Sequence, residues 1–196
     1  LFFRTNPKTN DGLIEALGGS QVEIEVVTVN NAGGTLLANE GIVNLELGAT
    51  VVGGTLDSVG DGFILGESNS VLEDVTNLGR YIVGSLNTNQ VDGSTLTNNG
   101  TIFIGNNVGA TTTLSFIADV SVGGSGEIVM QDSAATLMTD TGIQSTHAAG
   151  HTIRGRGVIN ADLVNKGTII CDRNPMFINP AGAGVDNQGT MRVINP

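Results

Sequence analysis

The sequence predicts an all-β protein: a parallel β-helix (β-solenoid) of about nine coils, with three short strands in each coil. Three observations predict it. A motif of an apolar residue, Asn, one or two further residues and Gly, often followed by Thr, recurs along the whole chain. Between the motifs apolar and polar residues alternate, which is the period of a strand. No segment has the 3.6-residue period of an amphipathic helix. We therefore expect residues 1–196 to form a single domain.

The motif asparagines set the expected coil length. From Asn10 to Asn187 there are 177 residues in eight intervals, a mean of about 22 residues. Asn and Gly tolerate the left-handed backbone of a sharp bend, and coils stacked about 4.8 Å apart bring equivalent amides within hydrogen-bonding reach. We expect a bend and a ladder of amides, rather than a ligand site, at Asn10, Asn31, Asn77, Asn98, Asn165 and Asn187.

The strands of each coil are bounded by Gly, Asn, Asp and Ser. After Asn31 the alternation predicts strands at 34–38, 42–47 and 49–52, and after Asn98 at 101–104, 113–117 and 120–122. Residues 13–17, Leu-Ile-Glu-Ala-Leu, would suit a helix in isolation. The motif that precedes them predicts a strand instead.

Composition argues against several classes of function. Nineteen acidic residues against eight basic ones give a net charge of −11, and such a surface repels nucleic acid. No apolar run approaches the ~20 residues that span a membrane. With 39% hydrophobic residues the chain can still bury a core. The single cysteine, Cys171, excludes an internal disulfide, and alternation predicts that it points into the core.

Segments such as Leu-Val-Asn-Lys-Gly-Thr-Ile at 163–169 and His-Thr-Ile-Arg-Gly-Arg-Gly-Val-Ile-Asn at 151–160 resemble repeats of bacterial surface and secreted β-helix proteins. These include autotransporter passengers and filamentous haemagglutinin-like adhesins of the pectin-lyase-like superfamily. The resemblance covers essentially the whole chain. It implies a right-handed helix and a structural or adhesive, non-enzymatic role outside the cell or on a bacterial surface, with glycans or proteins of a cell surface or matrix as partners. The superfamily also contains polysaccharide lyases and hydrolases, so a carbohydrate-active enzyme is the alternative.

Acidic residues stack on one predicted strand position. Glu23 and Glu25 alternate with inward Val22 and Ile24, and Glu46 recurs one coil later, with no basic residue nearby in sequence. Stacked carboxylates can raise one another's pKa or hold a hard cation such as calcium. The other interpretation is a solvated face that keeps the solenoid soluble. The sequence indicates no cofactor besides this calcium.

Two further pairs of residues could bind ligands. His147 and His151 are expected in a loop, where Asp140 is a conceivable third metal ligand, and we interpret the pair as incidental. Arg154 and Arg156 point the same way on a strand. They could bind an anion, or form an ordinary exposed pair.

Threonine after the motif glycine raises the possibility of an ice-binding face. The outward position two residues later is too irregular for one, because it reads Leu37, Asp57, Phe103, Ile170 and Arg192. The same position also contains Ile82 and Val129, so its middle is apolar. Such a stripe indicates that something packs over it.

Neither end of the chain shows a polar cap. Residues 1–10 match the second and third strands of a coil, with Leu1 and Phe2 equivalent to Met176 and Phe177, while residues 190–193 match a first strand. Joined head to tail, two copies would complete a coil. We expect either a piece of a longer array or a subunit that stacks on copies of itself into a filament with a repeat of about 43 Å. The contact residues would be Leu1, Phe2, Phe3, Met191 and Val193.

Overall fold

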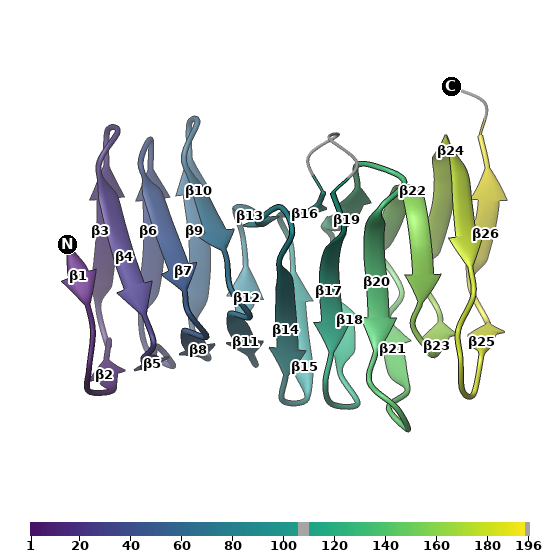
Figure 1. Cartoon of the computed structure of the whole chain (residues 1–196), viewed down its shortest axis with the longest axis horizontal. Helices are drawn as coiled ribbons and strands as arrows, with labels where there is room; N and C mark the ends of the chain where they lie inside the picture. The colour runs from purple at the N-terminus through teal and green to yellow at the C-terminus, as the bar shows by residue number, and fades with distance from the viewer. Residues whose placement is uncertain (106–109, 195–196) are drawn as a thin grey trace.

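The computed structural model describes residues 1–105 and 110–194, and its regular structure there is entirely β (Figure 1). The chain forms a β-solenoid of about nine turns, roughly 21 residues apart, with three strands in each turn. This confirms the predicted fold class. In the described residues no helix is long and apolar enough to cross a membrane.

Each turn contributes one strand to each of three parallel columns (Figure 1). The first column contains β1 (Phe2–Phe3), β4 (Gln21–Glu25), β7 (Ile42–Glu46), β10 (Phe63–Gly66), β13 (Arg80–Val83), β16 (Thr101–Ile104), β19 (Glu127–Met130), the first parts of β22 (Thr152–Asn160) and β24 (Thr168–Ile178), and β26 (Thr190–Val193). The second contains β2 (Lys8–Thr9), β5 (Thr28–Asn30), β8 (Thr50–Val52), β11 (Val71–Glu73), β14 (Thr88–Asp92), β17 (Thr112–Phe116), β20 (Ala135–Thr139) and the last parts of β22 and β24. The third contains β3 (Leu13–Leu17), β6 (Thr35–Asn39), β9 (Thr55–Val59), β12 (Thr76–Asn77), β15 (Thr95–Asn98), β18 (Ser121–Gly123), β21 (Ser145–His147), β23 (Leu163–Asn165) and β25 (Val185–Asn187).

The core is a stack of inward side chains from all three columns. In the first column the same inward position is occupied in successive turns by Val22, Val43, Ile64, Tyr81, Ile102, Ile128 and Ile153. Fully burying one such aliphatic side chain contributes about 1.5–3 kcal/mol. Because each turn packs only on its neighbours, most of the stability comes from contacts between adjacent turns.

Tyr81 is the largest side chain in this core, and Gly66 makes room for it. The Tyr81 hydroxyl donates a hydrogen bond to Oδ1 of buried Asn89 at 3.0 Å. A Cβ atom at Gly66 would lie 2.0 Å from the Tyr81 hydroxyl oxygen. Burial raises the pKa of Tyr81, so the phenol stays neutral.

The predicted left-handed bend at the motif asparagines is wrong. Positive φ values in described non-glycine residues occur instead at Thr5, Val26, Glu40, Leu47, Ser68, Asn69, Asp74 and Leu86. The motif asparagines keep negative φ values and are held through their side chains, as the hydrogen bonds described below show. Their conformation is therefore set by the amide group rather than by a tolerance for strained backbone.

The motif also occupies two different corners of the solenoid. Asn10 and Asn31 lie between the second and third columns, directly before β3 and β6. From Asn77 onward the motif asparagine ends a third-column strand and precedes a first-column strand. Asn77 accordingly lies opposite Leu56 in the register, not opposite an earlier asparagine. The prediction that the motif marks the same position in every turn is wrong, because the same short sequence can turn the chain at either corner.

This change of corner separates the residues of the expected outward stripe. Leu37 and Asp57 are paired in the third column, whereas Phe103 belongs to the first. The first-column stripe runs through Phe2, Glu23, Asn44, Leu65, Ile82, Phe103, Val129, Arg154, Ile170 and Arg192. Its middle is apolar, as predicted, and Val129 is only 2% exposed.

The expected junction between copies is corrected as well. Phe2 lies opposite Glu23 in the first column, and Phe177 lies opposite Val158 in the second. The equivalence of Phe2 and Phe177 is therefore wrong: residues 1–10 supply a first-column and a second-column strand, with Phe2 in the first column and Phe177 in the second. In the described residues the first column has ten strands and the other two have nine each.

Candidate functional site

The motif asparagines form two separate sets of hydrogen-bonded amides. In the first, Nδ2 of Asn10 donates to Oδ1 of Asn31 at 2.7 Å. Nδ2 of Asn31 then faces the backbone carbonyls of Gly53 and Thr55 at 3.4 Å. The next turn has Gly53 and Gly54 at this corner, and a Cβ atom at Gly54 would lie 1.8 Å from the Asn31 carbonyl oxygen. The first ladder therefore ends after two asparagines.

The second set is longer and includes both histidines. Nδ2 of Asn77 donates to Oδ1 of Asn98 at 2.7 Å, and Nδ2 of Asn165 donates to Oδ1 of Asn187 at 2.6 Å. Between these pairs, His151 Nε2 lies 3.0 Å from Asn98 Nδ2, and His147 Nδ1 lies 2.6 Å from Asn165 Oδ1. The two imidazoles join at 3.0 Å. We call the whole set the polar chain: Asn77, Asn98, His151, His147, Asn165 and Asn187.

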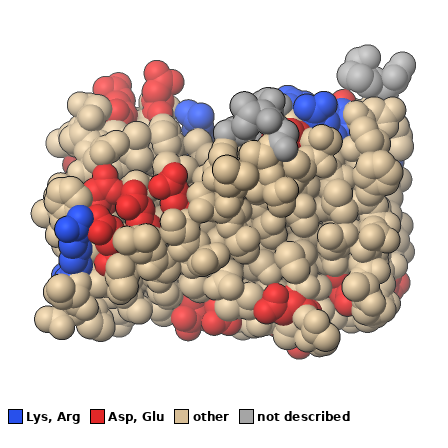
Figure 2. All heavy atoms as spheres, in the orientation of Figure 1, with Lys and Arg blue, Asp and Glu red and all other residues tan. Residues whose placement is uncertain are grey.

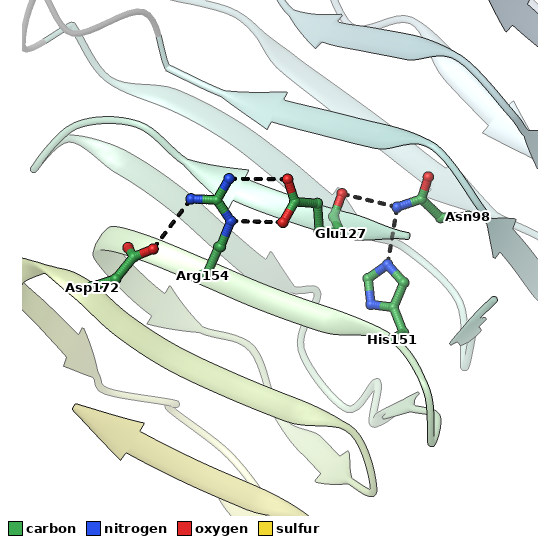
Figure 3. A network of polar contacts seen from close by, with 5 residues as sticks. All are labelled: Asn98, Glu127, His151, Arg154 and Asp172. Carbon is green, nitrogen blue, oxygen red and sulfur yellow. Dashed lines mark hydrogen bonds and ion pairs between the residues drawn. The ribbon is translucent and has the colours of Figure 1, made fainter. Parts of the chain in front are cut away.

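The Glu127 carbonyl fixes the orientation of the Asn98 amide, and the direction of the following hydrogen bonds in the polar chain depends on it. Nδ2 of Asn98 also donates to the Glu127 backbone carbonyl at 3.0 Å, so His151 Nε2 must accept from it (Figure 3). A neutral His151 then carries its proton on Nδ1 and donates to His147 Nε2. His147 in turn carries its proton on Nδ1 and donates to Asn165. Each donor therefore points to the next member of the polar chain, from Asn77 toward Asn187.

This arrangement requires both imidazoles to be neutral. His147 and His151 are each 1% exposed. Burial lowers the pKa of His147 below its usual 6.5, although its hydrogen bonds with Asn165 and His151 oppose the shift. Burial, followed by the charge of His147, lowers the pKa of His151 to about 3. If His151 Nε2 were protonated, its N–H would face the N–H donor of the Asn98 amide, and neither could accept.

Our interpretation of the histidines as an incidental loop pair is wrong. His147 belongs to β21, and His151 directly precedes β22. The contact recorded for the Asp140 carboxylate is with Ser115, whose Oγ donates to it at 3.4 Å. Over residues 1–105 and 110–194, no three His, Cys, Asp or Glu side chains are grouped to hold a metal ion. The histidines replace asparagines in the ladder.

A second network lies on the outer side of the same turns (Figure 3). The Arg154 guanidinium makes two hydrogen bonds with the Glu127 carboxylate, at 2.6 and 3.0 Å, and a third with Asp172 at 3.2 Å. These partners raise the pKa of Arg154. Because two carboxylates already neutralise it, Arg154 is not available as the anion site that its spacing from Arg156 suggested.

Glu127 connects the two networks through the strand β19. Its backbone carbonyl accepts from Asn98 in the polar chain, while its side chain holds Arg154 outside (Figure 3). The Arg154 and Glu127 side chains are each 31% exposed, so the ion pair itself contributes about 1 kcal/mol or less.

The predicted acidic ladder lies on the N-terminal turns. Glu23 pairs with Asn44 and Glu25 with Glu46 in adjacent strands, as the sequence predicted. The column also brings Arg4 to Glu25, at 2.7 Å between Nη2 and Oε1, although the sequence places no basic residue nearby. Burial, and then the neighbouring charges of Glu23, Glu67 and Glu25, raise the pKa of Glu46.

A shallow hollow of about 580 Å³ lies at the corner between the second and third columns. Thr139, Asp140, Asn160 and Asn179 are among its lining residues. Asp162, at the same corner, accepts hydrogen bonds from the Gly182 and Gly184 backbone N–H groups with Oδ1, so it closes a turn. The hollow brings no general acid and base together.

The residues expected to form end-to-end contacts differ in exposure. Leu1, Phe2 and Val193 are 68%, 62% and 73% exposed, whereas Phe3 and Met191 pack partly against the core. Cys171 is only half-buried, not a fully buried core residue. It lines an apolar hollow of about 240 Å³ with Met176, Met191 and Val193.

No family model, curated protein or solved structure matches this chain. Its possible functions are therefore argued from three features of the described residues. The polar chain is buried and holds the turns together. The glutamates of the N-terminal turns carry unneutralised charge, and the end strands expose apolar side chains.

Proposed function

We propose that this chain is a structural or adhesive, non-enzymatic β-solenoid of a bacterial cell surface or its extracellular surroundings, and that it works as one section of a longer stack of coils. The end strands are the observation that carries this proposal. One end presents the open edges of β1, β2 and β3, and the other those of β24, β25 and β26. Open parallel edges with exposed apolar side chains are surfaces on which a further coil can pair.

Stacked copies would not fill every column at their junction. If β1 of a second copy pairs with β26, the second and third columns are each one strand short there. Part of the core would stay open, so the contact between copies should be weaker than the contacts within the nine-turn solenoid itself.

The test is association as a function of concentration. Light scattering and negative-stain microscopy should show end-to-end association of the parent chain at high concentration. Where fibres form, the ten described first-column strands give a repeat of about 48 Å, rather than the 43 Å expected from nine coils. Phe2→Lys and Val193→Lys should reduce it. Leu86→Lys is the matched control, because Leu86 is 78% exposed on the side of the solenoid rather than at its ends.

Two outcomes would count against this function. If the parent chain and the Phe2→Lys and Val193→Lys variants are all monomeric at every concentration, the end strands are not interaction surfaces. Cleavage of an acidic or neutral polysaccharide by the purified chain, lost in Glu23→Gln or Glu46→Gln, would favour the carbohydrate-active alternative. A pull-down with bacterial or matrix glycans addresses the adhesive role separately.

A further inference from the structure

Four glutamates gather on the outer side of the N-terminal turns, and we call them the acidic cluster: Glu23, Glu25, Glu46 and Glu67. Figure 2 shows acidic side chains crowded on this part of the surface. Glu25 lies opposite Glu46 in the register, and Glu67 follows one turn later, where its N–H donates to the carbonyl of Leu45. Arg4 pairs with Glu25. The cluster therefore keeps a strong excess of negative charge.

Asn44 lies among these carboxylates and has an oxygen without a partner. Its side chain is 9% exposed, and its Nδ2 donates to the Glu46 carboxylate. Its Oδ1 is buried and has no hydrogen-bond partner, and the same is true of Oε2 of Glu23 on the neighbouring strand. Both atoms are acceptors, so neither can satisfy the other. A buried polar atom left unpaired costs about 1–3 kcal/mol.

A cation can be coordinated by both oxygens at once. The available ligands are carboxylates and one amide carbonyl, with no imidazole or thiol, and this donor set suits calcium rather than zinc or copper. The described residues hold no group of three acidic side chains already arranged for a metal. Glutamate side chains would have to turn toward Asn44. Calcium tolerates such irregular geometry better than magnesium, which demands a near-ideal octahedron.

We propose that Glu23, Asn44 and Glu46 bind a calcium ion on the outer face of the first column, with Glu25 or Glu67 completing the shell. The ion joins β4 to β7 and removes the repulsion between their carboxylates. This repulsion is what, after burial, raises the pKa of Glu46. The site does not depend on the structural or adhesive function proposed above, and its failure would leave that function untouched.

The experiment is calcium titration of the intact chain at physiological salt. Calorimetry should show one calcium ion bound per chain in the millimolar range or tighter, and calcium should raise the melting temperature more than magnesium does. Glu46→Gln and Asn44→Leu should both lose this response. Glu40→Gln is the matched control, because it removes one exposed glutamate charge outside the cluster and should keep the response.

Asn44→Leu supplies a second readout. If the unpaired Oδ1 of Asn44 is a calcium ligand, the leucine variant should no longer bind calcium. Without calcium it should be at least as stable as the parent. The proposal is overturned if the parent binds no calcium, or if Glu40→Gln weakens the response as much as Glu46→Gln does. It is also overturned if Asn44→Leu still binds calcium with unchanged affinity.

Discussion

Nε2 of His147 lies 3.0 Å from Nδ1 of His151, with the two rings perpendicular and their centroids 5.1 Å apart. This contact bridges the gap between two asparagine pairs that lie in different parts of the solenoid. A neutral imidazole carries one donor and one acceptor on opposite sides of the ring. It can therefore accept a hydrogen bond from one member of the ladder and donate one to the next. Two histidines thereby continue a chain in which each amide donates to the next.

The first prediction concerns pH. Because the folded pKa values of both histidines are lowered, the unfolded chain binds more protons below its ordinary histidine pKa of 6.5. The stabilising contribution is therefore present above pH 6.5 and is lost as the pH falls below it. Each histidine contributes a slope of at most about 1.4 kcal/mol per pH unit. Denaturant unfolding between neutral pH and about pH 5 should show this loss.

Imidazole ¹⁵N chemical shifts give an independent check on the same prediction. The chain has two histidines, so both signals come from the polar chain. In the folded state both rings should have a pKa below 6.5, about 3 for His151, and the neutral rings should carry the proton on Nδ1. The raised pKa of Glu46 has the opposite effect on the free energy of unfolding at lower pH. The folded state binds the Glu46 proton more readily than the unfolded state does, so this contribution grows as the pH falls. Ring nitrogens that titrate near 6.5 would contradict the inferred polar chain.

The second prediction tests what Asn98 does. Replacing it with glycine removes one hydrogen bond each from Asn77 Nδ2 and the Glu127 carbonyl, and takes from buried His151 Nε2 the amide donor that it accepts from. We expect Asn98→Gly to lower the free energy of unfolding by at least about 2 kcal/mol. Substitution by glycine distinguishes hydrogen bonding by the Asn98 amide from a left-handed bend at this position, because glycine adopts the left-handed conformation readily.

Asn30→Gly is the control for the backbone cost of the glycine itself. Asn30 is exposed, and its side chain accepts one hydrogen bond, of 3.4 Å, from the Ala32 N–H. Its replacement should cost about 1 kcal/mol or less. Equal losses at Asn98 and Asn30, measured by chemical denaturation, would show that the ladder contributes little.

The sequence could predict the fold because alternation and turn residues are local signals. The strands expected after Asn31 and Asn98 are present, with ends shifted by at most one residue. The corner that each motif occupies could not be predicted, because it depends on which column the preceding strand joined. The histidines were missed for a related reason: His151 is 53 residues from Asn98, its partner in the polar chain. Only the stacking of turns brings those two residues together.

The third prediction concerns the space beside Tyr81. A Cβ atom at Gly66 would lie 2.0 Å from the Tyr81 hydroxyl and 2.1 Å from Asn89 Oδ1. Gly66→Ala should therefore destabilise the chain by about 1–3 kcal/mol or more through overpacking. In the Tyr81→Phe background the hydroxyl is absent, so the same substitution should cost less. A double-mutant cycle by denaturant unfolding measures this coupling, and additive effects would contradict the contact.

The last prediction concerns backbone strain at an exposed corner. Val26 has a φ of 58°, a conformation that a β-branched residue rarely adopts, and its side chain is 65% exposed. Asparagine tolerates this region better, and little buried surface is lost on replacement. Val26→Asn should therefore raise the free energy of unfolding by about 1 kcal/mol. Val59→Asn is the matched control, since Val59 is 52% exposed but sits in the strand β9 with ordinary backbone. Because asparagine suits a strand less well than valine, Val59→Asn should lower the melting temperature or leave it unchanged. An increase of equal size in both variants would attribute the gain to surface polarity and contradict the strain at Val26.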